Sequence, residues 1–169
     1  MEQRISQTEA AKLRELLEGI RTAMVTTVHD GQLRSRPMAV QQSQFDEGVM
    51  WFMTGLDTEK AHEVEEDSAV NVAFANEGDN RFVSISGRCR LVQDIPKQKE
   101  LWTSFARAWF DGPEDSNLVL MRVEIDGAEY WDGPKSKMVM MVGWLKSKVT
   151  GGGIDMGDNA TIEPRATLK

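Results

Sequence analysis

Hydroxyl groups and a lysine collect where an apolar segment gives way to a polar, helix-forming one. Residues 49–54 are predicted to form a strand, and residues 58–66 a helix that begins near Thr58. The first N–H groups of a helix lack partners within it and carry partial positive charge. Lys60, in the first turn, opposes that charge, and a bound phosphate would neutralise both. The spacing of Thr54, Thr58 and Lys60 therefore indicates a phosphate-binding site.

Two arginines on another predicted strand are candidates for the same site. Arg34 and Arg36 are separated by Ser35, so their side chains lie on one face of the strand. Such pairs are most often exposed to solvent. Pro37, however, cannot donate a hydrogen bond to a neighbouring strand and indicates an edge or a bulge. Since a guanidinium grips a phosphate through two parallel hydrogen bonds, either arginine could add to the site.

An aromatic side chain ends the last long apolar segment. Residues 118–131 are predicted to form a strand, and Trp131 lies at its end, where burial normally decreases. Tryptophan is usually a core residue, and we expect this of Trp102 and Trp109, which recur at helical spacing. Trp131 is instead the candidate for contact with a flat ring. A phosphate site together with a surface for a planar group is what flavin mononucleotide (FMN) requires.

The composition limits the class of protein. The chain has 169 residues, enough for one domain with its own core, and 28% charged and 40% hydrophobic residues, as globular proteins have. The net charge of -7 argues against nucleic-acid binding. No signal peptide and no apolar stretch of the ~20 residues needed for a membrane span is present. One cysteine and two histidines are too few for a disulfide or a structural zinc site. We therefore expect a cytoplasmic protein without a metal, a membrane or a nucleic-acid partner.

The order of predicted elements favours a mainly β (α+β) fold. Asp30-Gly31 predicts a hairpin turn, and strands joined by tight turns cannot form a parallel sheet, which needs crossover helices. We expect a six-stranded antiparallel barrel with peripheral helices in a domain of residues 1–149. Residues 150–169, which open with three glycines, are expected to be a flexible tail. The predicted strands span residues 20–28, 32–43, 49–54, 68–74, 82–92 and 118–131, and the predicted helices span 7–18, 58–66 and 95–110, the last with Leu101, Trp102, Phe105, Ala108 and Trp109 as its buried stripe.

Other polar residues are given structural roles. The acidic run from Glu63 to Asp67 is expected on the solvent-exposed face of its helix, His29 in an exposed turn, and Cys89 in the core. No Ser-His-Asp or Cys-His set and no phosphate-binding glycine loop is found, so no catalytic residue is assigned. The basic, apolar stretch Lys135 to Lys148 is expected to cover a pocket or a partner subunit rather than to lie on a membrane.

Taken in order, these motifs resemble the FMN-binding split-barrel superfamily of pyridoxamine 5′-phosphate oxidase-like proteins, and most closely its general stress protein 26 branch. The resemblance covers about residues 6–145. The segments that carry it are Arg34 to Met38, Trp51 to Thr54 with Thr58 to Lys60, Ser84 to Gly87, and Glu129 to Gly133.

The resemblance implies a split-barrel homodimer with two flavins, FMN or alternatively FAD, in clefts between the subunits. It implies that Lys60 and Thr58 hold the phosphate with Arg34 or Arg36, and that Trp131 contacts the flavin across the interface. Further flavin contacts are implied for Ser35, Pro37, Met53 and Thr54.

Three functions follow from the resemblance as alternatives. The first is a flavin-dependent oxidoreductase that uses reduced nicotinamide and a small-molecule substrate. The second is a flavin carrier or sensor in the stress response, without turnover. The third, oxidation of pyridoxamine phosphate, is disfavoured because Pro134 to Met141 contain no histidine. Split barrels also serve other cofactors, so haem and deazaflavin stay open.

Overall fold

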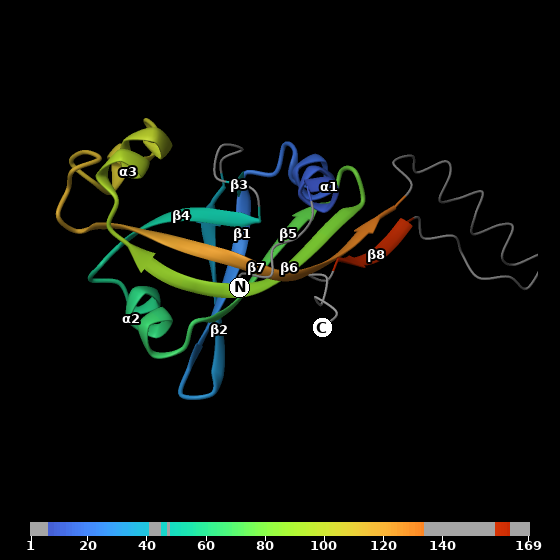
Figure 1. Cartoon of the computed structure of the whole chain (residues 1–169), viewed down its shortest axis with the longest axis horizontal. Helices are drawn as coiled ribbons and strands as arrows, with labels where there is room; N and C mark the ends of the chain where they lie inside the picture. The colour runs from blue at the N-terminus through green and yellow to red at the C-terminus, as the bar shows by residue number, and fades with distance from the viewer. Residues whose placement is uncertain (1–6, 41–44, 47, 134–157, 163–169) are drawn as a thin grey trace, which may run out of the picture.

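A curled antiparallel sheet is the centre of the structure, and helices lie around it (Figure 1). The computed structural model describes residues 7–40, 45–46, 48–133 and 158–162. Within these residues the strands follow the order β2-β1-β5-β6-β7-β4-β3, and β8 pairs with the end of β7. The strands are β1 Thr22–His29, β2 Gln32–Ala39, β3 Phe45–Asp46, β4 Val49–Gly55, β5 Ala69–Asn76, β6 Arg81–Val92, β7 Leu118–Asp132 and β8 Asp158–Ile162, and the α-helices are α1 Gln7–Leu17, α2 Glu59–Glu66 and α3 Ile95–Leu101.

The split-barrel fold expected from the sequence is confirmed. Six long strands, β1, β2, β4, β5, β6 and β7, form the curl, and every described pairing is antiparallel. The short strands β3 and β8 add to it. Strand β8 falls within the segment expected to be a tail, and its Ile162 is buried. The boundary at residue 149 stays a prediction, and the stretch Lys135 to Lys148 lies outside the described residues.

The β1–β2 hairpin forms as its turn predicts. Asp30 and Gly31 have φ angles of 49° and 73°, the pair of positive values that a tight two-residue hairpin turn requires. Strand β2 pairs with β1 alone in the described part of the chain, so Pro37 lies on an edge strand, as predicted. The strand predicted over residues 49–54 forms as β4, between β7 and the two-residue β3.

The core fills the inside of the curl, and α1 and α2 close it. Arg81, which is 6% exposed, donates to the carbonyl oxygens of Glu15 and Leu16 and so satisfies the C-terminal end of α1. Gly19, with φ of 80°, follows the end of that helix in the left-handed conformation that favours glycine. The largest fully buried apolar side chains are Phe52, Leu13, Leu16, Met50, Ile85, Leu101, Leu118, Leu120 and Met121.

The single helix expected over residues 95–110 was wrong. Helix α3 ends at Leu101, Trp102 has an extended backbone (ψ of 132°), and only a 3₁₀ turn at Ala106–Ala108 follows. Thr103 and Ser104 stand at the break, and both residue types favour caps and turns over helix interiors because their hydroxyls compete for backbone groups.

The buried stripe assigned to this helix was also largely wrong. Leu101 is buried, but Trp102 is half-buried and Ala108 is exposed. Phe105 and Trp109 are 56% and 64% exposed. A helical repeat of apolar residues indicates one apolar face, but it does not say whether that face meets the core or a cavity.

Candidate functional site

The junction between β4 and α2 has the geometry that the sequence predicted. Thr58 is the N-cap residue of α2, with an extended backbone, and its side chain does not accept a hydrogen bond from the helix. Instead the Thr58 hydroxyl donates to the carbonyl oxygen of Gly55 (2.8 Å) and lies 3.1 Å from the hydroxyl of Thr54. The N–H groups of the first turn of α2 are therefore not capped by this residue.

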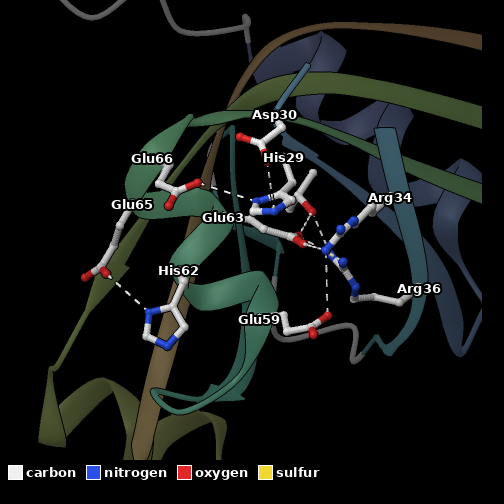
Figure 2. Close-up of polar contacts among 10 residues, drawn as sticks. His29, Asp30, Arg34, Arg36, Glu59, His62, Glu63, Glu65 and Glu66 are labelled. Carbon is white, nitrogen blue, oxygen red and sulfur yellow. Dashed lines mark hydrogen bonds and ion pairs between the residues drawn. The ribbon is translucent and has the colours of Figure 1, made fainter. Parts of the chain in front are cut away.

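Two arginines of β2 converge on one buried carboxylate of α2 (Figure 2). Arg36 donates through Nη2 to Glu63 Oε2 (2.9 Å), and Arg34 through Nη1 to Glu63 Oε1 (3.1 Å). Thr27 of β1 donates to the same carboxylate (2.5 Å) and accepts from Arg36 (2.6 Å). Arg34 also lies 3.8 Å from Glu59. Helix α2 is thereby linked to both strands of the first hairpin.

The expectation that Glu63 lies on the solvent-exposed face of its helix was wrong, because its side chain is 2% exposed. Burial alone would raise the pKa of Glu63. Hydrogen bonds from Thr27 and Arg36, the positive charge of Arg36 and a hydrogen bond from Arg34 outweigh burial and hold that pKa below its usual value. Glu63 is thus ionised at neutral pH, and it neutralises part of the charge of the two arginines.

Lys60 is the third cation of this cluster. Burial and the nearby positive charge of Arg36 lower its pKa, and the carboxylates of Asp57 and Glu63 offset this only in part. A positive charge held under such conditions gains from an anion beside it, because the anion replaces lost hydration and counters Arg36.

A cavity of about 280 Å³ connects this cluster with an apolar surface. Lys60, Thr58 and Thr54 line one part of it, and Phe105 and Trp109 line another. A second cavity of about 810 Å³ shares Phe105 and residues 37–39 of the edge strand β2 with the first. The other residues that line the first cavity are Pro37, Met38, Ala39, Met53, Gly55, Thr103, Ala106 and Phe110.

The structure brings together most, but not all, of the residues singled out in the sequence. Pro37, Met53, Thr54, Thr58 and Lys60 line the first cavity. Arg34 and Arg36 do not line the cavity; both bind Glu63, and the charge of Arg36 acts on Lys60. Flavin contact by all these residues stays a prediction.

Ser35 and Trp131 lie apart from the cavity. Ser35 is exposed, and its hydroxyl is 2.6 Å from that of Thr26 on the neighbouring strand. Trp131 is 43% exposed, is paired across the β6–β7 ladder with Phe82, and is not among the described residues that line the cavity. Contact between Trp131 and a flavin stays a prediction.

Sequence reasoning missed Glu63 and the two aromatic residues. A usable signal for Glu63 was that it stands between Ala61 and Val64, two buried residues of α2. A second signal was the pair of arginines on one strand face, since two neighbouring cations that lose water need an anion. For Phe105 and Trp109 the only signal was an apolar repeat.

Other titratable groups offer no separate chemistry. His29, expected to be exposed, is half-buried and lies 3.5 Å from both Glu66 and Asp30 (Figure 2). Burial raises the pKa of the Cys89 thiol to about 12, so it is protonated and unreactive at neutral pH. In the described ranges no group of three or more His, Cys, Asp and Glu side chains could hold a metal ion. No described helix has the length and apolarity to cross a membrane.

The fold and this site define a split-barrel protein in which a cationic cluster borders an aromatic-walled cavity. A family model for "Pyridoxamine 5'-phosphate oxidase like" proteins matches residues 8–155. The chain belongs to the pyridoxamine 5′-phosphate oxidase-like family.

Its relatives include general stress proteins. General stress protein 26 of Bacillus subtilis is 26% identical over 117 residues, which are 67% of this chain and 81% of that protein. A structure of a putative general stress protein 26 from Jannaschia sp. CCS1 is 24% identical, with a TM-score of 0.75 over 94% of this chain and 99% of that one. The general stress FMN/FAD binding protein from Xanthomonas citri is 31% identical, with a TM-score of 0.65 over 78% of this chain and 93% of that one.

Proposed function

We propose that this protein is an FMN-binding protein of the general stress type, with FAD as an alternative ligand. The observation that carries the proposal is that Lys60, with Thr54 and Thr58, lines a cavity that Phe105 and Trp109 also line, while the charge of Arg36 acts on Lys60 from nearby. The name of the Xanthomonas citri relative as an FMN/FAD binding protein supports it.

The residues present fit a phosphate. Three cations, Arg34, Arg36 and Lys60, are balanced by three carboxylates, Asp57, Glu59 and Glu63, so the cluster is formally neutral. Of these six groups only the Lys60 amine lines the cavity, so an anion there would meet the cation and not the carboxylates. Lys60 would hold the phosphate directly. The Thr54 hydroxyl could turn its proton from Thr58 to the phosphate, whereas the Thr58 proton is donated to the carbonyl oxygen of Gly55. Each guanidinium has five N–H donors, so its bonds to Glu63 leave others for a phosphate oxygen.

The ring system would lie along the edge strand β2, where residues 37–39 line both cavities. Pro37 has no N–H, and the backbone of an edge strand is available to a ligand rather than to another strand. Met53, on β4, lines the same cavity. When bound, the flavin supplies hydride transfer, and these side chains bind it, orient it and exclude water.

We expect the protein to work as a homodimer in the cytoplasm. Trp131 and Phe82 stand exposed on the outer face of the sheet, away from the cavity of their own chain. A second subunit would bury this pair and bring Trp131 to the flavin held by the first. Exposed aromatic residues are favoured contacts in such interfaces.

A second function, flavin carriage or sensing without turnover, is favoured by one observation. Among the described residues that line the cavity, Lys60 is the only titratable side chain, and a lysine kept for phosphate is not free to transfer protons. Turnover of a reduced nicotinamide and a small-molecule acceptor would then rest on the flavin alone.

A titration of cofactor-stripped protein with FMN, FAD and riboflavin, followed by flavin fluorescence, tests the proposal. Tight FMN binding and far weaker riboflavin binding are expected. Failure of all three to bind would refute the proposal and turn attention to haem and deazaflavin. With the loaded protein, oxidation of reduced nicotinamide above the rate with free FMN would identify an oxidoreductase, and its absence a carrier or sensor. Pyridoxal phosphate formation from pyridoxamine phosphate would identify the oxidase.

A further inference from the structure

Two large aromatic side chains are held out of the core between α3 and β7. Phe105 and Trp109 are 56% and 64% exposed, with ring centroids 4.7 Å apart and planes tilted by 50°. Their segment is anchored, because Leu101 and Ala106 on either side of Phe105 are buried. The two rings therefore project from a fixed piece of backbone, and they leave a large apolar area in water, which is unfavourable by roughly 25 cal/mol per Å².

These rings face the cavity that Lys60 and Thr58 line. Phe105 also lines the second cavity, together with Pro37 and Met38 of the edge strand β2. A ligand with an anionic end at Lys60 and a planar end along β2 would therefore have the two rings in the lining of its binding site.

We propose that Phe105 and Trp109 form an aromatic wall that contacts the planar ring of the ligand whose phosphate binds at Lys60. This inference rests on the proposed function, and it adds that the ring is held by the same subunit as the phosphate. The wall makes two contacts of different kinds, because rings tilted by 50° cannot both stack face to face on one plane. One ring stacks and the other meets the ligand with its edge, which are the two arrangements that aromatic pairs prefer.

The aromatic wall and the cationic cluster should act on different parts of the ligand. FMN and riboflavin share the same ring and differ in the phosphate. Loss of an aromatic contact should weaken both ligands by the same factor, whereas loss of Lys60 should weaken FMN alone. The ratio of the two affinities thus separates the roles of the wall and the cluster.

The experiment measures FMN and riboflavin dissociation constants for the full-length protein and for Trp109→Ala, Phe105→Ala and Trp109→Phe. Trp109→Ala and Phe105→Ala should each weaken both ligands by about two- to tenfold, the range of an aromatic contact. Trp109→Phe should retain most of the affinity. Bound flavin should fluoresce more strongly in Trp109→Ala, since a stacked indole quenches it.

Two controls make the result specific. Trp102→Ala removes the same side chain from a half-buried position that does not line the cavity, and it should leave both affinities within twofold of the wild-type values. Lys60→Ala should weaken FMN and not riboflavin. Thermal denaturation and sedimentation of each variant, without ligand, check folding and subunit assembly.

The outcomes separate this inference from the proposed function. If the wild-type protein binds no flavin, the proposed function fails, and the wall has no flavin ring to contact. If FMN binds tightly and Trp109→Ala and Phe105→Ala bind FMN and riboflavin as the wild type does, the wall is overturned and the proposed function stands. If these variants instead dimerise less, and the dimers that remain bind flavin as tightly as the wild type does, the two rings form a subunit contact and the inference is wrong.

Discussion

Replacement of Glu63 by glutamine tests whether the hydrogen bonds that Glu63 accepts from Thr27, Arg34 and Arg36 stabilise the fold. The side chain is 2% exposed and accepts three hydrogen bonds, from Thr27 at 2.5 Å, Arg36 at 2.9 Å and Arg34 at 3.1 Å. A hydrogen bond to a charged group contributes about 1.5–3 kcal/mol, and loss of one partner of a buried ion pair costs about 3–5 kcal/mol. The arginine side chains are 41% and 23% exposed, so water can solvate part of the released charge. We therefore expect Glu63→Gln to lower the free energy of unfolding by about 2–4 kcal/mol.

The pH dependence of this effect has a defined sign. The pKa of Glu63 is lowered in the folded state, so its ionised form stabilises the fold above the pKa of the unfolded chain, about 4.3. That contribution is lost as the pH falls through the lower pKa of the folded state. The stability difference between wild type and Glu63→Gln should thus be constant between about pH 6 and 8 and shrink below about pH 4.

Urea unfolding of the ligand-free protein, followed by tryptophan fluorescence at several pH values, measures this difference. Glu65→Gln is the matched control, because that side chain is on the same helix, is 64% exposed and pairs only weakly with His62 at 3.9 Å. The control should stay within about 0.5 kcal/mol of the wild type. A Glu63→Gln variant as stable as the control would show that the Glu63 hydrogen bonds do not stabilise the fold. A stability difference that persists unchanged at pH 3 would show that the ionised form of Glu63 is not its source.

Three further predictions concern the ligand, the interface and the thiol. FMN affinity should fall as the pH rises through the pKa of Lys60, which lies below the usual 10.5, because anion binding needs the protonated amine. Riboflavin affinity, measured over the same pH range, should not fall in this way. Trp131→Ala should weaken flavin binding only in the dimer, and an unchanged affinity in a protein shown to be dimeric by sedimentation would contradict contact across the interface. Cys89 should resist thiol reagents at pH 8 in the native protein and react at once in urea, because burial raises its pKa to about 12; rapid labelling of the native protein would show that the thiol is accessible.

Local chemistry made much of the fold predictable. Asp30-Gly31 fixed the first hairpin, because the positive φ angles of its turn are those that these residues tolerate. Thr58 marked the start of α2 to within one residue, and Pro37 indicated the edge strand. These features depend on neighbours in the chain, so the sequence alone contains them.

Features that depend on distant partners were not predictable in the same way. Glu63 looked like one member of an acidic, solvent-exposed run, and only the return of β2 beside α2 places Arg36 next to it. The aromatic repeat from Leu101 to Trp109 looked like a core stripe, and the break at Thr103 turns its second half toward a cavity instead. Burial and pairing are decided by tertiary contacts, which a local pattern does not record.

A four-way comparison of FMN and riboflavin binding to the wild type and to Lys60→Ala tests whether Lys60 binds the phosphate of FMN. The cycle removes the phosphate from the ligand and the cation from the protein, separately and together, and so isolates their interaction. Lys12→Ala, which removes the same charge from α1, controls for net charge. We expect a coupling of about 1.5–3 kcal/mol, which is a 10- to 150-fold loss of FMN affinity in Lys60→Ala with riboflavin affinity unchanged. Equal losses for both ligands, or no loss for either, would contradict it.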